Sequence, residues 1–202
     1  MILIDNCSFK YHDGGISIAI IPAKHILMRY LSIFILIFYS QNTFAEVKPA
    51  DDIPAIKKAM VLAVEDARIT DSLYLELSSK KAPSPLIIAY TGTLEALKAK
   101  HSWNPYQKVS YVARSQKTLQ KAVNADPANL EIRFMRFSVQ HFTPAFLGYS
   151  KELNEDRRMI IKKYSQKTFG KADQVLIKNI AGFMISSNRC TSEEIKILKK
   201  YS

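Results

Sequence analysis

The segment from Ala128 to His141 constrains the fold most, because its apolar side chains occupy two separate faces of a helix. Two stripes at helical spacing run along it, namely Leu130, Phe134 and Phe137, and then Ile132, Met135 and Val139. A helix that is apolar on two faces has to be covered on two sides. The pattern therefore predicts that this helix lies inside a stack of helices and not at its end.

The helical period recurs from residue 51 to the end of the sequence, and no segment shows convincing alternation with a period of two. Capping residues and prolines separate the periodic segments, for example Asn104-Pro105 and Asp126-Pro127. Thr191 to Glu194 has the form of a capping box, which starts a last short helix. The expected helices cover residues 51–67, 71–79, 86–100, 105–125, 128–141, 149–164, 173–186 and 191–200. The sequence therefore predicts an all-α fold of seven or eight helices.

Small side chains form a stripe beside the apolar face of the expected helix 86–100. The stripe consists of Ala89, Gly92, Ala96 and Ala99. Small residues let a neighbouring helix approach closely, whereas a glycine inside a helix costs about 1 kcal/mol relative to alanine. We therefore expect Gly92 to serve close helix packing.

The string YVARSQKTLQKAVNADPANLEIRFMRF, residues 111–137, resembles the junction between two tetratricopeptide repeats. The family's small residue, large apolar residue, alanine and helix-ending proline correspond to Ser115, Leu119, Ala122 and Pro127. The resemblance implies an antiparallel array of helix pairs over roughly residues 86–165. The chain also resembles secreted bacterial proteins of similar size, which implies no particular chemistry.

The sequence departs from the tetratricopeptide pattern in two ways. The family repeat has about 34 residues and a tight internal turn, whereas Trp103-Asn104-Pro105 and then Thr143 to Gly148 lengthen the turns here. The Trp, Leu-Gly and Tyr of the family's first helix are also not in place. The array is therefore expected to be degenerate, and an ordinary irregular helical bundle is the alternative.

Residues 28–47, MRYLSIFILIFYSQNTFAEV, have the composition of a bacterial secretion signal. Arg29 follows Met28, and the apolar run from Tyr30 to Tyr39 is interrupted only by Ser32. The run fits a signal peptide and is shorter than the roughly 20 residues that span a bilayer. Thr43 and Ala45 make a small-x-small site before Glu46. The sequence predicts a signal peptide at 28–45, a periplasmic or secreted protein, and no stable transmembrane span after cleavage.

The signal starts at an internal methionine, and a signal acts when it emerges first. We therefore expect translation to begin at Met28, with residues 1–27 a misassigned upstream start that is disordered. A long amino-terminal region with an uncleaved anchor is the alternative. The folded part is then a single helical domain, residues 46–202.

The chain carries 29 Lys and Arg against 18 Asp and Glu, a net charge of +11. Removing residues 1–45 takes away three basic and two acidic side chains and leaves +10, so the basic character belongs to the folded part. Such an excess suits anionic surfaces such as phosphate, acidic glycans or lipid head groups. The lysines are spread along the chain and not massed, so we expect an ordinary solvated surface. No nucleic-acid partner is expected, because support for a basic helix face with interleaved aromatics is weak and export argues against it.

The sequence gives no sign of a metal or cofactor site. Cys7 and Cys190 belong to no C-x-x-C pair, and no His/Cys spacing is typical of zinc binding. We therefore expect no metal and no cofactor. After signal cleavage Cys190 has no intramolecular partner, and we expect it to be a packed small side chain.

Arg133, Arg136 and Gln140 share the remaining stripe of the helix 128–141. On the concave side of a stack they are suited to bind a carboxylate or phosphate. Of the two interpretations, we expect that these side chains are solvated or pair with nearby acids. The mixed charges from Glu152 to Arg158 are expected to form a solvated face.

Two aromatic groups are further candidates for binding. Trp103 and Tyr106 flank a turn together with His101 and are suited to form a carbohydrate or peptide platform. Of the two interpretations, we expect the Trp103 ring to be buried over the helix ends. Phe142 and Phe146 belong to a connecting segment that is rich in aromatic side chains. We expect these side chains to pack into the core, and a surface that binds a partner is the alternative.

No catalytic motif is present, since the sequence lacks H-E-x-x-H, G-x-S-x-G and a phosphate-binding glycine loop. The sequence therefore predicts an exported, non-catalytic scaffold with a protein, peptide or anionic envelope partner. The alternative is a small periplasmic hydrolase or envelope-modifying enzyme. A buried, converging His–carboxylate pair in a pocket would favour the enzyme.

Overall fold

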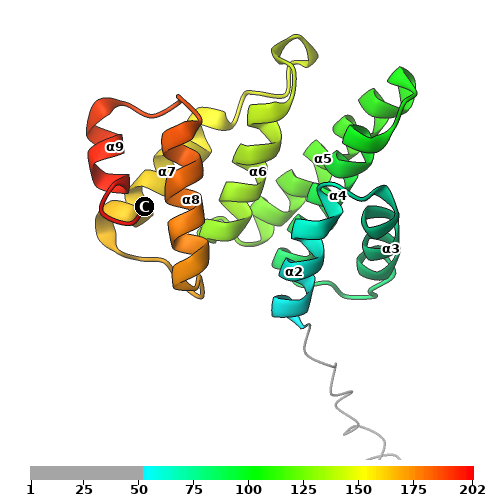
Figure 1. Ribbon diagram of the computed structural model, residues 1–202, viewed down its shortest axis with the longest axis horizontal. Coiled ribbons are helices and arrows are strands. Elements are labelled where there is room, and N and C mark those ends of the chain that lie inside the picture. The colour runs from blue at the N-terminus through cyan, green and yellow to red at the C-terminus, as the bar shows by residue number, and fades with distance from the viewer. Residues whose placement is uncertain (1–51) are drawn as a thin grey trace, which may run out of the picture. The chain divides into compact units, whose positions relative to one another are not determined.

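The computed structural model describes residues 52–202, in which helices and connecting segments occur but no strand (Figure 1). The eight α-helices of this part are α2 (Ile53–Ala63), α3 (Ala67–Ser78), α4 (Pro85–His101), α5 (Pro105–Ala125), α6 (Leu130–Phe142), α7 (Leu153–Gln166), α8 (Gln174–Ser186) and α9 (Ser192–Leu198). A short 3-10 helix, η1 (Ala145–Leu147), lies between α6 and α7. The described residues confirm the all-α fold. The predicted signal peptide 28–45 and the upstream segment 1–27 lie outside the described residues.

Side-chain caps start most of these helices by accepting a backbone N–H of the first turn. The capping residues are Asp52, Asp66, Ser84, Asn104, Asn129, Asp173 and Thr191. The capping box of Thr191 and Glu194 is present as predicted. Asp66 corrects one prediction, because it accepts the Arg68 N–H at 2.8 Å and starts a new helix. Ala67 therefore belongs to α3 and not to the first helix.

Gly92 lies on α4 against α5, and these two helices are the most extensively packed pair of described helices. A Cβ at this position would lie 2.9 Å from Leu119 Cγ and 3.1 Å from the Leu119 backbone nitrogen. The Ser115 hydroxyl donates a hydrogen bond to the Gly92 carbonyl at 2.6 Å. The prediction that Gly92 serves close helix packing is confirmed.

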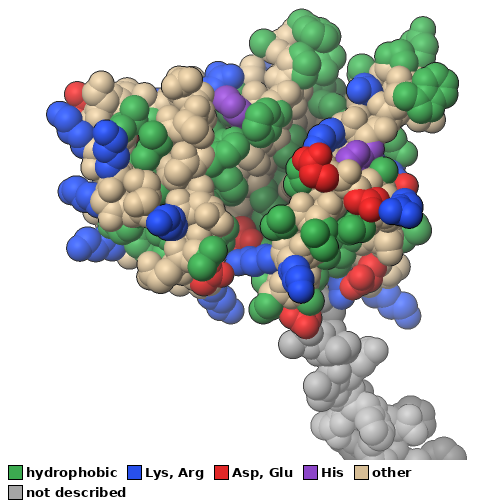
Figure 2. All heavy atoms as spheres, in the orientation of Figure 1, with side chains coloured by type: hydrophobic (Ala, Val, Ile, Leu, Met, Phe, Trp, Pro, Cys, Tyr) green, Lys and Arg blue, Asp and Glu red, His purple; other side chains and the backbone are tan. Residues whose placement is uncertain are grey.

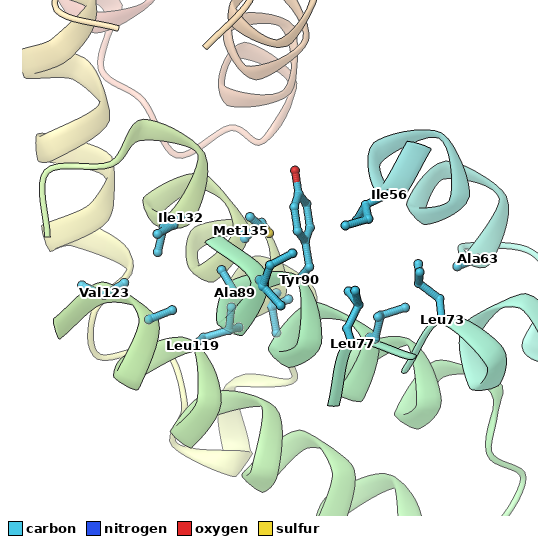
Figure 3. Close-up of a cluster of buried hydrophobic side chains, with 14 residues drawn as sticks. Ile56, Ala63, Leu73, Leu77, Ala89, Tyr90, Leu119, Val123, Ile132 and Met135 are labelled. Carbon is cyan, nitrogen blue, oxygen red and sulfur yellow. The ribbon is translucent and has the colours of Figure 1, made fainter. Parts of the chain in front are cut away.

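The buried apolar side chains form two clusters, and α6 contributes to both. The first cluster is built by α2 to α6 (Figure 3) and takes from α6 Ile132, Met135 and Val139. The second is built by α6 to α9 and takes from α6 Leu130 and Phe137, with Phe134 packed against it. The two apolar stripes of α6 are thus covered by different helices, which confirms that this helix lies inside the stack.

Sequence neighbours make the most extensive helix contacts, namely α4 with α5, α3 with α4, and α6 with α7. All the described helices belong to one compact unit, residues 51–202. None of them combines the length and the apolar composition needed to cross a bilayer. The tetratricopeptide character of the helix pairs stays a prediction.

Cys190 packs against the second cluster and is half-buried. Burial, together with the charge of Glu194, raises the pKa of the Cys190 thiol to about 11. The side chain is therefore a packed, protonated thiol at neutral pH, in line with the expectation from the sequence.

Candidate binding site beside the α4–α5 turn

The third face of α6 is polar but buried, with Arg133, Arg136 and Gln140 5%, 1% and 2% exposed. Asp156, from the first turn of α7, is fully buried against it. Arg136 donates through Nε and Nη2 to the two carboxylate oxygens of Asp156, both at 2.7 Å. Arg133 donates through Nη1 to Asp156 at 2.9 Å and also to Glu155. These ion pairs tie α6 to α7.

The same cluster corrects the expectation of a solvated charged face after Glu152. Asp156 is buried because both of its arginine partners lie on an interior face of α6. Glu155 lies at the rim, where the hydrogen bond from Arg133 holds the pKa of its carboxyl below the ordinary value. A ligand-binding role for Arg133 and Arg136 stays a prediction, and both guanidinium groups already bind carboxylates of this chain.

Gln140 continues the polar stripe toward α5. Its Nε2 donates to Gln116 Oε1 at 3.0 Å and to Glu152 Oε2 at 2.8 Å. Within residues 52–202, Gln116 Nε2 and Gln140 Oε1 are buried without a hydrogen-bond partner. A buried polar atom left unpaired is costly, so this end of the stripe is less well satisfied than the arginine end.

Trp103 and Tyr106 lie at the α4–α5 turn and are 89% and 86% exposed. The interpretation that Trp103 buries its ring over the helix ends is therefore wrong. Asn104 gives the local reason, because its side chain accepts the Tyr106 N–H at 2.9 Å and starts α5 immediately after Trp103. This abrupt helix start leaves the indole outside the packed pair.

A surface cavity of about 180 Å³ opens beside Trp103. Its lining comes from α3, α4, the turn and α5 and includes Asp71, Lys98, His101, Trp103, Gln107 and Tyr111. Tyr106 is not part of this lining, and no hydrogen bond or ion pair between described residues links the cavity to Arg133, Arg136 or Gln140. The structure therefore divides the predicted site residues between the turn and the buried face of α6.

The charges and hydrogen-bonding groups of the cavity are partly engaged already. The Lys98 ammonium group binds the Asp71 carboxylate and lies 5.4 Å from the centre of the Tyr111 ring. His101 Nε2 lies 3.0 Å from the Ala63 carbonyl oxygen. In a neutral ring this contact makes Nε2 the protonated nitrogen and leaves Nδ1 as an acceptor.

The cavity combines one flat aromatic surface with a polar rim. An indole face packs against the apolar side of a sugar ring or a flat side chain, and the rim can orient the ligand by hydrogen bonds. No described residue accepts a hydrogen bond from the indole N–H of Trp103. The sequence identified Trp103 and His101. Asp71 was missed because only folding brings α3 to the turn, and Tyr111 was missed because it lies further along α5.

A larger cavity, of about 540 Å³, lies along α2 and α3. No aromatic side chain lines it, and two of its charged groups, Arg68 and Asp66, pair with each other at 3.2 Å. This larger cavity has no solvent-exposed aromatic ring like that of Trp103. The cavity beside Trp103 is therefore the stronger candidate.

The aromatic connector after α6 is also exposed, with Phe142 at 74% and Phe146 at 86%. The expectation that it plugs the core is wrong for these two residues. His141 stays closer to the body, where burial and then the charge of Arg189 lower its pKa. Arg189 Nε donates to His141 Nδ1 at 3.2 Å.

Comparison of the chain with protein-family models, curated proteins and solved structures found no match. The candidate site is therefore assigned from its geometry. Within residues 52–202, no group of three or more His, Cys, Asp or Glu side chains is arranged to hold a metal ion. The assignment rests on an exposed indole beside a cavity with a polar lining.

Proposed function

We propose that the chain is an exported, non-catalytic helical scaffold that binds a peptide, protein or cell-envelope component beside Trp103. The proposal takes the helix pairs to be tetratricopeptide-like. The observation that carries it is the 89% exposure of Trp103 next to the polar cavity. Tryptophan is enriched among the residues that dominate binding energy. Export to the periplasm or beyond is supported by the composition of residues 28–47.

The rival function, a small periplasmic hydrolase, calls for a histidine that converges with a carboxylate. His101 and Asp71 both line the cavity. However, the His101 ring contacts the Ala63 carbonyl, and the Asp71 carboxylate binds Lys98. Binding is therefore the function that this geometry supports best.

To test this, the purified chain is immobilised and incubated separately with peptidoglycan sacculi, with envelope phospholipid vesicles and with periplasmic proteins. The amount of each fraction that the chain retains is measured. We expect at least one fraction to be retained. Replacing Trp103 by alanine should lower the retained amount roughly tenfold, the usual effect of truncating a central aromatic contact.

The matched control is Leu75→Ala on α3, because Leu75 is also largely exposed, at 68%, and lies outside the cavity lining. This variant should retain the fraction as the unmodified chain does. The proposal fails if no fraction is retained, or if Trp103→Ala and Leu75→Ala retain equal amounts.

A further inference from the structure

Two connections between helices present large aromatic side chains to solvent. Trp103 in the α4–α5 turn and Tyr106 in the first turn of α5 form one group, and Phe142 at the end of α6 and Phe146 in η1 form the other, with exposed fractions between 74% and 89%. Both connections lie at the same edge of residues 52–202, at the top of Figure 1. Apolar side chains gather over both in the space-filling view (Figure 2). We call these four residues the aromatic edge.

The helical core contacts only one of the four side chains of the aromatic edge. Phe142 contacts the rings of His141 and Phe183, with centroids 4.9 Å and 5.9 Å away. Trp103, Tyr106 and Phe146 make no aromatic ring contact with other described residues and belong to neither buried cluster. Apolar side chains that protrude together from a folded surface mark an interaction site.

The segments that carry the aromatic edge contain basic but no acidic residues, although Lys98 and Lys100 pair with Asp71 and Glu65 from other parts of the chain. Between Glu95 and Asp126 the sequence has six Lys or Arg and no Asp or Glu, and between Glu131 and Glu152 it also has no acidic residue. Lys108, on the first turns of α5, and Lys151, shortly after η1, are exposed. The segments that carry the four aromatics therefore contribute positive charge and no negative charge of their own.

We propose that the aromatic edge docks on the surface of an anionic phospholipid bilayer. This inference rests on the proposed function, because it specifies the envelope component. Tryptophan and tyrosine favour the interface between head groups and acyl chains, and neighbouring lysines are attracted by anionic lipids. Two separate protruding connections suit a deformable, laterally extended surface, and attachment is interfacial because no helix of residues 52–202 can span a bilayer.

Trp103 is the only tryptophan of the chain, so its fluorescence reports on this edge alone and not on the apolar segment 30–39. The chain is titrated with vesicles of phosphatidylglycerol and phosphatidylethanolamine, and separately with vesicles of phosphatidylcholine. We expect a blue shift of the emission, and quenching by brominated acyl chains, with the anionic vesicles only. Added salt should weaken the binding, because it screens the lysines.

Phe146→Ser and Tyr106→Ser remove one aromatic each and leave the reporter in place. Each should lower the vesicle partition coefficient roughly tenfold, as expected for losing a buried aromatic side chain. The matched control is Val175→Ser, because Val175 is 70% exposed and belongs to the first turn of α8, at the opposite edge in Figure 1. Circular dichroism checks that all three variants are folded. The control should bind as the unmodified chain does.

The inference is overturned if the Trp103 emission is unchanged by anionic vesicles, or if Phe146→Ser and Val175→Ser bind equally. Retention of sacculi or of a periplasmic protein through Trp103, together with an unchanged emission in vesicles, would overturn the lipid inference and leave the proposed function in place. Retention of none of the three fractions would overturn both.

Discussion

At the scale of single residues, Glu95 on α4 is a carboxylate that is only 3% exposed. It accepts hydrogen bonds from the Thr118 hydroxyl at 2.7 Å and from the Tyr74 hydroxyl at 3.5 Å. Burial raises its pKa, although these hydrogen bonds and Arg114 act in the opposite direction. A raised folded-state pKa stabilises the fold below the unfolded-state pKa, and this contribution is lost as the pH rises through the folded-state value.

Glu95→Gln should therefore raise the free energy of unfolding at pH 7 relative to the unmodified chain. The difference should shrink toward pH 4, where the carboxyl takes up its proton. Urea denaturation at the two pH values measures it, with Glu76→Gln on the exposed side of α3 as the control. A difference that is equal at both pH values, or larger at pH 4, would contradict the assigned cause.

The Asp156 carboxylate neutralises the charge of two buried arginines, whereas Glu155 contacts them from the solvent-exposed side. Asp156→Asn should lower the free energy of unfolding by about 3–5 kcal/mol, because it removes the carboxylate charge that neutralises the two buried guanidinium groups. Glu155→Gln, whose side chain is 54% exposed, should cost about 1 kcal/mol or less. Urea denaturation of both variants tests the contrast, and similar losses would show that the two carboxylates are equivalent.

At the scale of elements, the α4–α5 pair depends on the missing side chain of Gly92. Gly92→Ala places a Cβ 2.9 Å from Leu119 Cγ, and the backbone of α5 cannot move away without disturbing the first cluster. Overpacking of this kind costs about 1–3 kcal/mol, against a gain of about 1 kcal/mol in helix propensity. We expect a net loss of stability in thermal or urea denaturation.

Gly182 on α8 provides the matched control, because a Cβ there meets no atom within 4 Å. Gly182→Ala should therefore keep the propensity gain and stabilise the fold by up to about 1 kcal/mol. Opposite signs for the two alanine variants are the expected result. A stabilised Gly92→Ala variant would mean that α4 and α5 pack less closely than described.

At the scale of the whole molecule, α6 joins the two apolar clusters of residues 52–202 and also carries the buried ion pairs to α7. If α6 unfolds, both clusters lose the side chains that this helix contributes. We therefore expect this part of the chain to unfold in one cooperative transition. Hydrogen exchange in increasing urea should give the same opening free energy for core amides of α4 and α8, whereas separate values would show that the halves unfold independently.

The predictions made from the sequence succeeded where a local rule applies. Asn104 and Thr191 cap helices because a short polar side chain before a periodic segment satisfies the first backbone N–H groups. They failed where the outcome depends on a distant partner. Asp156 could not be recognised as buried, because its arginine partners lie 20 and 23 residues earlier in the chain.

The sequence by itself determined that the chain is helical, several of the caps and the two apolar stripes of α6, because periodicity and capping act within a few residues. Tertiary structure decided which polar and aromatic side chains lie inside. Arg136 is buried because Asp156 neutralises it there, and Trp103 is exposed because α5 starts immediately after it and no other described helix covers the turn. The burial of a side chain depends on what packs against it, and that is a property of the assembled helices.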